Sequence, residues 1–204
     1  MKIKGNLIAI EGIEGTGKST LSHHLVEYLK PQGAILTREP GGSELAEDIR
    51  AILKSNQYDI DAKTECLLMF ASRSLHLSKL IKPELEEGKI VICDRYVDAS
   101  YAYQGGGRGV SSGAISALDQ WICGDIQPDI SILLVCDPEI AMNRVYSRSA
   151  EIDRFEKEDL VFFKRTQDAY MQKIATRPNH IMIDASQAKE DVFAQAIAHI
   201  EKWL

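Results

Sequence analysis

A glycine-rich loop near the start of the chain constrains its fold more than any other feature. Residues 12–19 read Gly-Ile-Glu-Gly-Thr-Gly-Lys-Ser, which fits the pattern of a phosphate-binding P-loop. The apolar run at 7–10 before the loop predicts a buried strand, and the leucines that recur on one side of 18–29 predict a helix after it. This order of strand, loop and helix indicates an α/β fold that binds a nucleoside triphosphate.

The positions of this loop differ in their expected roles. Backbone N–H groups and the positive end of the helix are expected to hold phosphate oxygens. Lys18 is expected at the β- and γ-phosphates, and the Ser19 hydroxyl on Mg²⁺. The alternative is an ordinary glycine turn, against which the strand, the loop spacing, the Lys-Ser pair and the helix argue together. The nucleotide-binding set is Gly12, Ile13, Glu14, Gly15, Thr16, Gly17, Lys18, Ser19 and Thr20.

Short apolar runs alternate with longer segments of helical period along the rest of the chain. Strands are expected at 7–11, 34–37, 89–94, 130–136 and 180–184. Helices are expected from 18, from about 43, over about 62–86, around 115–122, from 138, over about 157–175 and over 189–203. In the helix at 62–86 the expected core contacts are Leu67, Phe70, Leu77, Leu80 and Ile81. The alternation favours a parallel five-stranded sheet with helices on both faces, in a single domain of residues 1–204.

Polar side chains fall where the predicted strands end. Ligands of parallel sheets gather at this edge, and the side chains expected there are Glu11, Arg38, Asp94 and Asp137. Asp94 follows an apolar strand and is expected to hold Mg²⁺, directly or through water, opposite the P-loop. A structural aspartate that caps the next turn is the alternative. The neighbouring Arg95 is expected to donate to a phosphate through both arms of its guanidinium group.

Bulk properties argue against several classes of protein. The net charge of −6, from 24 Lys and Arg against 30 Asp and Glu, argues against a nucleic-acid polymer as the main partner. No apolar stretch has the length of a membrane span, and the first residues lack the apolar core of a signal peptide. The four cysteines lie far apart, without the paired spacing of a metal site. These features indicate a cytoplasmic protein with no membrane partner.

Further motifs occur in an order and at spacings that resemble the bacterial thymidylate kinases. They are Glu-Gly-Ile-Glu-Gly at 11–15, Arg-Glu-Pro-Gly-Gly at 38–42, Asp-Arg-Tyr at 94–96 and Ala-Tyr-Gln-Gly-Gly-Gly-Arg-Gly at 102–109. Asp-Arg-Phe-Glu at 153–156 is similar to the end of that family's lid. The match runs from the first strand to residues 183–186, which is essentially the whole chain.

This resemblance implies a fold, a reaction and a set of partners. The implied fold is the three-layer α/β fold of the P-loop nucleoside monophosphate kinases, with a short lid at about 144–155. The implied reaction transfers the γ-phosphoryl group of ATP to dTMP and gives dTDP, for dTTP synthesis. The implied cofactor is Mg²⁺, the implied partners are ATP and dTMP, and the implied assembly is a homodimer in which an apolar helix face serves the contact.

The resemblance also implies how the base is recognised. Phe70 corresponds to the aromatic residue that stacks under the thymine, and Arg73, on the same side of the helix, is expected to donate to a thymine carbonyl. Ser100 and Gln104 correspond to polar contacts with the base. Tyr103 corresponds to the tyrosine whose bulk excludes a ribose 2′-hydroxyl. Judged without the resemblance, Phe70 is a core residue and Arg73 a surface residue.

Two arginines and one glutamate are implied at the acceptor side of the reaction. Arg95 and Arg50 correspond to residues that hold the substrate phosphate, although a solvated helical arginine is the alternative for Arg50. Glu14 corresponds to the acidic residue near the 3′-hydroxyl of the substrate sugar. A carboxylate inside an anion-binding loop is unfavourable beside a triphosphate, so its presence indicates a role toward the other substrate or the metal.

The arginines of the lid are the last candidates for catalysis. Residues 13–16 of the P-loop contain no arginine, whereas residues 144–154 contain three, a pattern that resembles the lid-arginine type of thymidylate kinase. Arg148 is the first choice for the group that reaches the transferring phosphoryl, and Arg154 is the second. A local ion pair of Arg154 with Glu151 or Glu158 is the alternative. The expected catalytic set is Lys18, Arg95, Arg148 and Arg154.

Three competing functions remain open at this stage. The nearest is another nucleoside monophosphate kinase, acting on cytidylate, uridylate or guanylate, against which Tyr103 and the Phe70 and Arg73 pair argue. A GTPase-type switch is disfavoured because the chain contains no Asn-Lys-x-Asp stretch for reading guanine. A nucleotide-binding scaffold without turnover is disfavoured by the intact Lys18, Asp94 and lid.

Overall fold

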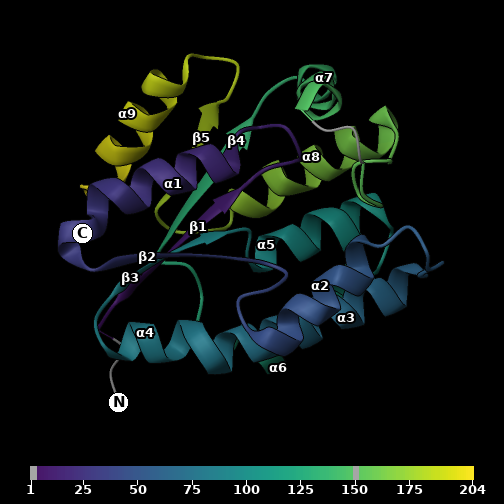
Figure 1. Ribbon diagram of the computed structural model, residues 1–204, viewed down its shortest axis with the longest axis horizontal. Coiled ribbons are helices and arrows are strands. Elements are labelled where there is room, and N and C mark those ends of the chain that lie inside the picture. The colour runs from purple at the N-terminus through teal and green to yellow at the C-terminus, as the bar shows by residue number, and fades with distance from the viewer. Residues whose placement is uncertain (1–3, 149–151) are drawn as a thin grey trace.

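A parallel five-stranded sheet forms the middle layer of the molecule (Figure 1). The computed structural model describes residues 4–148 and 152–204. Within them the strands lie in the order β2-β3-β1-β4-β5, and every neighbouring pair is parallel. Their bounds are Asn6–Glu11 (β1), Ala34–Arg38 (β2), Ile90–Asp94 (β3), Ile130–Val135 (β4) and His180–Asp184 (β5). The predicted five-stranded parallel sheet is therefore confirmed.

Helices cover both faces of this sheet. Alternate residues of a strand point to opposite faces, and β1 follows this rule. Leu7 and Ala9 belong to the core that includes residues of α3 and α6, whereas Ile8 and Ile10 belong to the core that includes residues of α1 and α9. The helices are α1 (Lys18–Leu29), α2 (Glu44–Lys54), α3 (Ala62–His76), α4 (Lys82–Glu86), α5 (Val97–Ser100), α6 (Ser112–Ile122), α7 (Pro138–Arg148), α8 (Leu160–Ile174) and α9 (Lys189–Ile200).

The long helix predicted over 62–86 consists of three consecutive pieces. Between α3 and α4 lies a π-helical turn, η2 (Leu77–Ile81), and the helical path continues through it. Phe70, Leu77 and Ile81 are buried as predicted. Leu67 is 58% exposed, so its predicted place in the core is wrong. It is a large apolar side chain on the outer surface of α3.

Several predicted ends shift by a few residues. The helix predicted from about 157 begins at Leu160, because Asp159 caps it by accepting a hydrogen bond from the backbone N–H of Phe162 at 2.7 Å. The helix predicted from 138 does begin at Pro138, where Asp137 accepts from the backbone N–H of Glu139 at 2.8 Å.

One helical segment was not predicted from the sequence. After β3 the chain forms α5 and then a π-helical segment, η3 (Tyr101–Gly107), which packs against α8. Its apolar residues are few and three glycines follow each other, so the segment lacks a clear helical period. The segment carries Ser100, Tyr103 and Gln104 to the edge of the sheet where the candidate site lies. Helical segments of the π type often occur at functional sites.

Candidate active site

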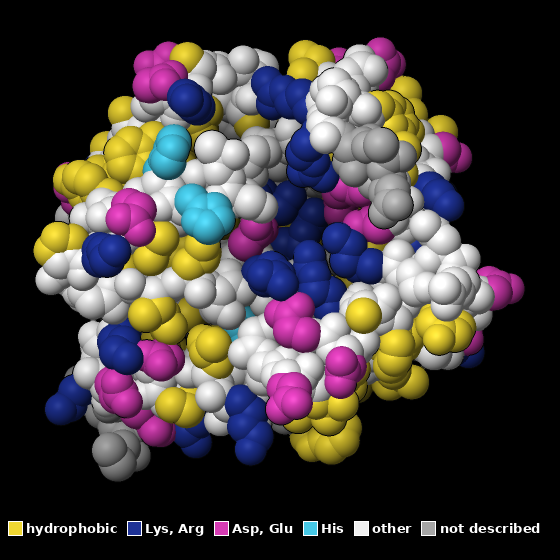
Figure 2. Space-filling view, viewed as in Figure 1, with side chains coloured by type: hydrophobic (Ala, Val, Ile, Leu, Met, Phe, Trp, Pro, Cys, Tyr) yellow, Lys and Arg dark blue, Asp and Glu magenta, His cyan; other side chains and the backbone are white. Residues whose placement is uncertain are grey.

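A cavity of about 420 Å³ opens beside the carboxyl ends of β1, β2 and β3. It is lined by the P-loop, residues 38–40, α2, α3, the end of β3, the α5–η3 segment, α7, Asp153, Phe155 and Glu156. Figure 2 shows Lys and Arg side chains gathered in a central hollow of the surface. The cationic residues that line the cavity are Lys18, Arg38, Arg50, Lys54, Arg73, Arg95, Arg144 and Arg148. The acidic ones are Glu14, Glu39, Asp94, Asp153 and Glu156, so positive charge prevails in a chain of net negative charge.

The P-loop forms the floor of this cavity, and α1 begins at its last lysine. Gly15 has φ +78°, and a Cβ atom there would lie 2.0 Å from the carbonyl oxygen of Ala141, so only glycine fits. The Lys18 ammonium donates to the carbonyl oxygen of Ile13 at 2.7 Å. Burial, helped by the charge of Arg95, lowers the pKa of Lys18 to about 8. A buried ammonium beside a helix N-terminus is well suited to an anionic ligand.

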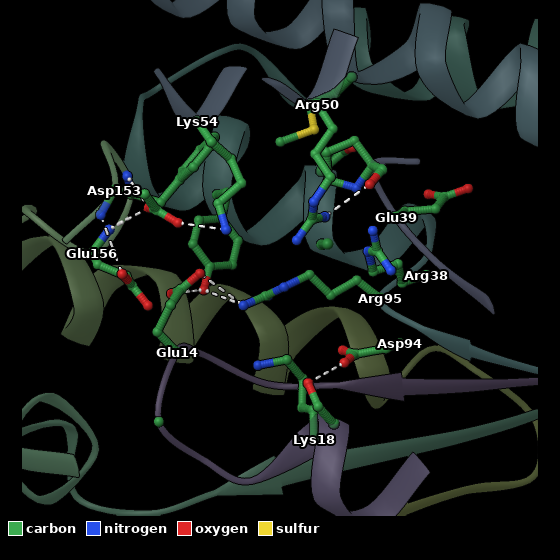
Figure 3. A pocket seen from close by; sticks show the side chains of 18 of the residues that line it. Glu14, Lys18, Arg38, Glu39, Arg50, Lys54, Asp94, Arg95, Asp153 and Glu156 are labelled. Carbon is green, nitrogen blue, oxygen red and sulfur yellow. Dashed lines mark hydrogen bonds and ion pairs between the residues drawn. The ribbon is translucent and has the colours of Figure 1, made fainter. Parts of the chain in front are cut away.

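The hydroxyl of Ser19 and the carboxylate of Asp94 meet across the cavity. Ser19 Oγ donates to Asp94 Oδ2 at 2.7 Å (Figure 3). Both groups are oxygen ligands of the kind that Mg²⁺ accepts, and Mg²⁺ usually completes its shell with phosphate and water. The described residues contain no cluster of three or more His, Cys, Asp or Glu side chains able to hold a metal. Two oxygen ligands from the protein fit an ion whose remaining ligands are phosphate and water.

Arg95 occupies the centre of the cavity and has φ +70°, which is unusual for a residue with a side chain. Its guanidinium group donates to the carbonyl oxygen of Gly12 at 2.8 Å, to Tyr170 Oη at 3.0 Å and to Glu14 Oε1 at 2.8 Å. It also lies over the ring of Tyr103, 4.8 Å from the ring centroid. The Tyr103 hydroxyl donates to Glu14, which closes a triad of Arg95, Glu14 and Tyr103 (Figure 3).

A second arginine approaches Arg95 from α2. Arg50 donates to the carbonyl oxygen of Pro40 at 2.8 Å and points into the cavity (Figure 3). Burial lowers the pKa of Arg50, and the nearby charge of Arg38 adds to this lowering. Arg38 itself pairs with Glu47 at 3.0 Å. Arg50 and Arg95 both line the cavity, and such converging guanidinium groups indicate a place for a second anion.

Arg73, which was predicted to contact the base, is held by three hydrogen bonds and is almost fully buried. Its Nε donates to Glu39 Oε2 at 2.6 Å, Nη1 donates to Ser100 Oγ at 2.9 Å, and Nη2 donates to the carbonyl oxygen of Tyr96 at 3.1 Å. Arg73, Ser100 and Gln104 all line the cavity. The structure thus brings together the three polar residues that the sequence assigned to the base.

Phe70 is the residue of this group that the structure does not bring to the cavity. Its side chain is 1% exposed in the core beneath the sheet, and the guanidinium of Arg73 lies over its ring at 4.7 Å. The neighbouring α3 residue that lines the cavity is Met69. Sequence reasoning missed Met69, although residues 69 and 73 are four apart and share one side of a helix.

The lid arginines are divided between the cavity and the body of the protein. Arg148 lines the cavity, pairs with Glu156 at 2.6 Å and has a side chain 64% exposed. Arg144 also lines the cavity and donates to the carbonyl oxygen of Ala185 at 2.9 Å. Residues 149–151 of the predicted lid, Glu151 among them, lie outside the described residues.

Arg154 is not among the residues that line the cavity. Its Nε donates to the carbonyl oxygen of Leu53 at 2.9 Å, and its Nη1 pairs with the buried carboxylate of Glu65 at 2.6 Å. Glu158, one of its two suggested partners, pairs with Arg108 at 2.6 Å instead. Arg154 thus anchors the end of the lid segment to α2 and α3.

Comparisons with known proteins agree with this geometry. The family model described as Thymidylate kinase matches residues 10–196. A thymidylate kinase of Pseudomonas syringae pv. tomato is 43% identical over 93% of this chain and 92% of its own length. A thymidylate kinase of Nitrosospira multiformis is 45% identical over 93% of this chain and 94% of its own length. The crystal structure of thymidylate kinase from Ehrlichia chaffeensis superposes with a TM-score of 0.78 at 32% identity, and covers 97% of this chain and 98% of that one.

Proposed function

The chain belongs to the thymidylate kinase family, and we propose that the cavity described above is where it carries out the family's reaction. It is a kinase that phosphorylates dTMP to dTDP with ATP. The observation that carries the assignment of the site is the meeting of three cationic side chains in one cavity. Lys18 comes from the P-loop, Arg95 from the residue after β3, and Arg50 from α2. Such a cavity accommodates two phosphorylated nucleotides end to end.

ATP is the ligand that we assign to the P-loop. Backbone N–H groups of residues 12–20 and the N-terminus of α1 hold the phosphates, and Lys18 neutralises the β/γ side. Ser19 and Asp94 would hold Mg²⁺ together with its waters, and the ion would supply positive charge against the negative charge that develops during transfer. The protein's own contribution at this point is to orient these two oxygen ligands through their mutual hydrogen bond.

The phosphate of dTMP is the ligand that we assign to Arg95 and Arg50. Glu14 and Tyr103 hold Arg95 from one side, which fixes the direction of its guanidinium group before substrate arrives. The acceptor is already an oxyanion, so transfer depends on positioning and on cations rather than on a strong base. Arg73, Ser100 and Gln104 then contact the base, and the bulk of Tyr103 excludes a 2′-hydroxyl. Phe70 supports this wall from behind, through Arg73.

The lid completes the reaction site in this proposal. The chain acts as a single domain of residues 1–204, with the lid at about 144–155 closing over the two nucleotides. Arg148 is the arginine assigned to the transferring phosphoryl, because it lines the cavity and most of its side chain is exposed. Closure excludes water and so limits hydrolysis of ATP.

A coupled assay tests the reaction and its substrate. ATP and Mg²⁺ are mixed in turn with dTMP, dUMP, CMP, UMP and GMP, and the release of ADP is followed. We expect release that depends on the acceptor and is fastest with dTMP. Hydrolysis without an acceptor favours a GTPase-type switch, and no release with any of the five favours a scaffold. Faster release with CMP, UMP or GMP moves the assignment to another nucleoside monophosphate kinase.

A homodimer and a cytoplasmic location complete the proposal. α2 packs on α3 and α3 on α6, and all three helices carry large apolar side chains exposed to solvent. A second copy of the chain is the partner that we assign to this surface, whose residues are Leu45, Ile52, Leu67 and Trp121. No helix among the described residues is long and apolar enough to cross a bilayer. All four cysteines are buried and free of disulfides, which suits a reducing compartment.

A further inference from the structure

Glu65 of α3 lies behind the cavity and touches three side chains from other segments. Its carboxylate is fully buried. Oε1 accepts from Gln104 Nε2 at 2.8 Å, and Oε2 accepts from Arg108 Nε at 3.2 Å and pairs with Arg154 Nη1 at 2.6 Å. A carboxylate without exposure is costly unless it is fully paired. Here two guanidinium groups balance its charge, and one amide completes its hydrogen bonds.

The pairing with Glu65 decides which end of the Gln104 amide faces the cavity. An ionised carboxylate accepts hydrogen bonds and donates none, so the amide nitrogen of Gln104 must be the atom that faces it. Gln104 lines the cavity and is itself buried. The end of the Gln104 amide turned away from Glu65 is therefore its carbonyl oxygen, which is an acceptor.

A neighbouring arginine supplies the opposite kind of group. Arg73 lines the same cavity, donates to Ser100 four positions before Gln104, and has only donors. A thymine ring offers an acceptor at O4 and a donor at N3–H, whereas cytosine offers an amino donor at C4 and an acceptor at N3. A fixed donor from Arg73 beside a fixed acceptor from Gln104 therefore matches thymine and opposes cytosine at both positions.

From this geometry we propose that Glu65 is a positioning residue that sets the preference for thymine over cytosine by fixing the amide of Gln104. Glu65 does not touch the substrate, and the proposal rests on the base site assigned above. The contact of Glu65 with Arg154 joins α3 to residue 154, and neither residue lines the cavity. Only the contact with Gln104 distinguishes one base from another.

The ratio of kcat/KM for dTMP to that for dCMP measures the proposed effect. The variant Glu65→Gln keeps the shape of the side chain, but its amide can donate as well as accept, so Gln104 is no longer held in one orientation. We expect the ratio to fall about tenfold or more, because the site then pairs with either edge. A role confined to folding or to the lid lowers both values in proportion and leaves the ratio unchanged, which would overturn the proposal.

A second variant keeps the test decisive if Glu65→Gln folds poorly. Gln104→Leu removes the amide itself, so the same ratio must fall, and an unchanged ratio refutes the proposal whatever Glu65→Gln does. Where Glu65→Gln does fold, the double variant Glu65→Gln/Gln104→Leu must have the same dTMP to dCMP ratio as Gln104→Leu alone, because the two residues act through one contact. Dissociation constants for dTMP and dCMP from calorimetry give the same comparison without turnover.

A matched control separates specificity from stability. Asp119→Asn changes another largely buried carboxylate, which accepts from Tyr101 Oη at 3.0 Å and Gln127 Nε2 at 2.9 Å and does not line the cavity. We expect it to leave the dTMP to dCMP ratio unchanged, and a fall as large as that in Glu65→Gln would contradict the proposal. A wild-type protein that fails to phosphorylate dTMP contradicts the proposed function instead, whereas a retained ratio in the variants contradicts only the role of Glu65.

Discussion

The ammonium group of Lys18 is expected to make ATP binding at the P-loop depend on pH. Burial lowers its pKa to about 8, so the group is mostly protonated below this pH and mostly neutral above it in the ligand-free protein. A triphosphate binds the protonated form, so we expect the dissociation constant of ATP to rise as pH increases beyond about 8, approaching tenfold per pH unit. Calorimetric titration between about pH 7 and pH 9.5 measures this dependence. A constant affinity over that range in the wild type would contradict the assignment, and Lys18→Met is expected to bind weakly without the pH dependence.

The buried carboxyl group of Glu11, behind the site, makes the stability of the folded protein depend on pH. Burial and the nearby Asp98 carboxylate raise the pKa of Glu11 to about 8 from its ordinary value of 4.5. Between pH 4.5 and about pH 8 the Glu11 carboxyl group is ionised in the unfolded chain and protonated in the folded protein. The stability that Glu11 confers is therefore lost as pH rises through this range. We expect the stability of Glu11→Gln relative to wild type to increase from pH 5 to pH 8, as measured by denaturant unfolding. An equal difference at both pH values would refute this expectation.

Arg148 is the side chain on which the assignment of catalysis depends most directly. It lines the cavity, yet its side chain is 64% exposed and its partner Glu156 lies on the same lid region. We expect Arg148→Ala to fold normally and to lose about tenfold or more in kcat, since positioned arginines are worth far more than that in phosphoryl transfer. Lys157→Ala is the control, because Lys157 is an exposed cation nearby that does not line the cavity. Unchanged turnover in Arg148→Ala transfers the role to Arg144 or Arg154.

Among the elements, η3 owes its position to glycines that allow close packing on α8. A Cβ atom on Gly107 would lie 2.5 Å from the ring of Phe162. We expect Gly107→Ala to lower the free energy of unfolding by about 1–3 kcal/mol through overpacking. Because η3 also carries Tyr103 and Gln104, the KM for dTMP is expected to rise as well. Denaturant unfolding and steady-state kinetics measure the two effects.

Gly113 provides the matched control for this substitution. It lies in α6, and a Cβ atom there would have no atom within 4 Å. Gly113→Ala is expected to be neutral or to stabilise the protein by up to about 1 kcal/mol, because alanine favours a helix. Equal effects of the two substitutions would show that close packing is not the reason for glycine at 107.

The elements that the sequence predicts well are those with a strong hydrophobic period. β1 and α1 flank a P-loop of recognisable spacing, and their bounds agree with prediction within one residue. The α5–η3 segment was missed because its helical turns are short and are stabilised by packing on α8 rather than by their own residues. Periodicity also cannot tell which of two adjacent residues faces a ligand: Phe70 lies in the core, and Met69, for which no role was predicted, lines the cavity.

Over the whole molecule, the sequence predicts the site better than it predicts the contacts that support the site. Strand order places the P-loop, Asp94 and Arg95 at one edge, because the carboxyl ends of parallel strands share it. Glu65 and Arg154 are 89 positions apart, and nothing in a single sequence indicates that they pair. Such a distant ion pair can be identified only once the packing of α3 against the segment that carries Arg154 is known. The ion pair with Glu65 holds Arg154 outside the set of residues that line the cavity.

The proposed dimer concerns the molecule as a whole, and its test uses two exposed apolar side chains on different surfaces. Leu67 of α3 is 58% exposed, and Trp203 near the C-terminus is 51% exposed. A charge in the centre of an apolar interface is costly, so we expect Leu67→Glu to convert a wild-type dimer into a monomer in light scattering coupled to gel filtration. Trp203→Glu, outside the α2, α3 and α6 surface, is expected to leave the dimer intact. A monomeric wild type, or a dimer that survives Leu67→Glu and dissociates with Trp203→Glu, would show that this surface is not the interface.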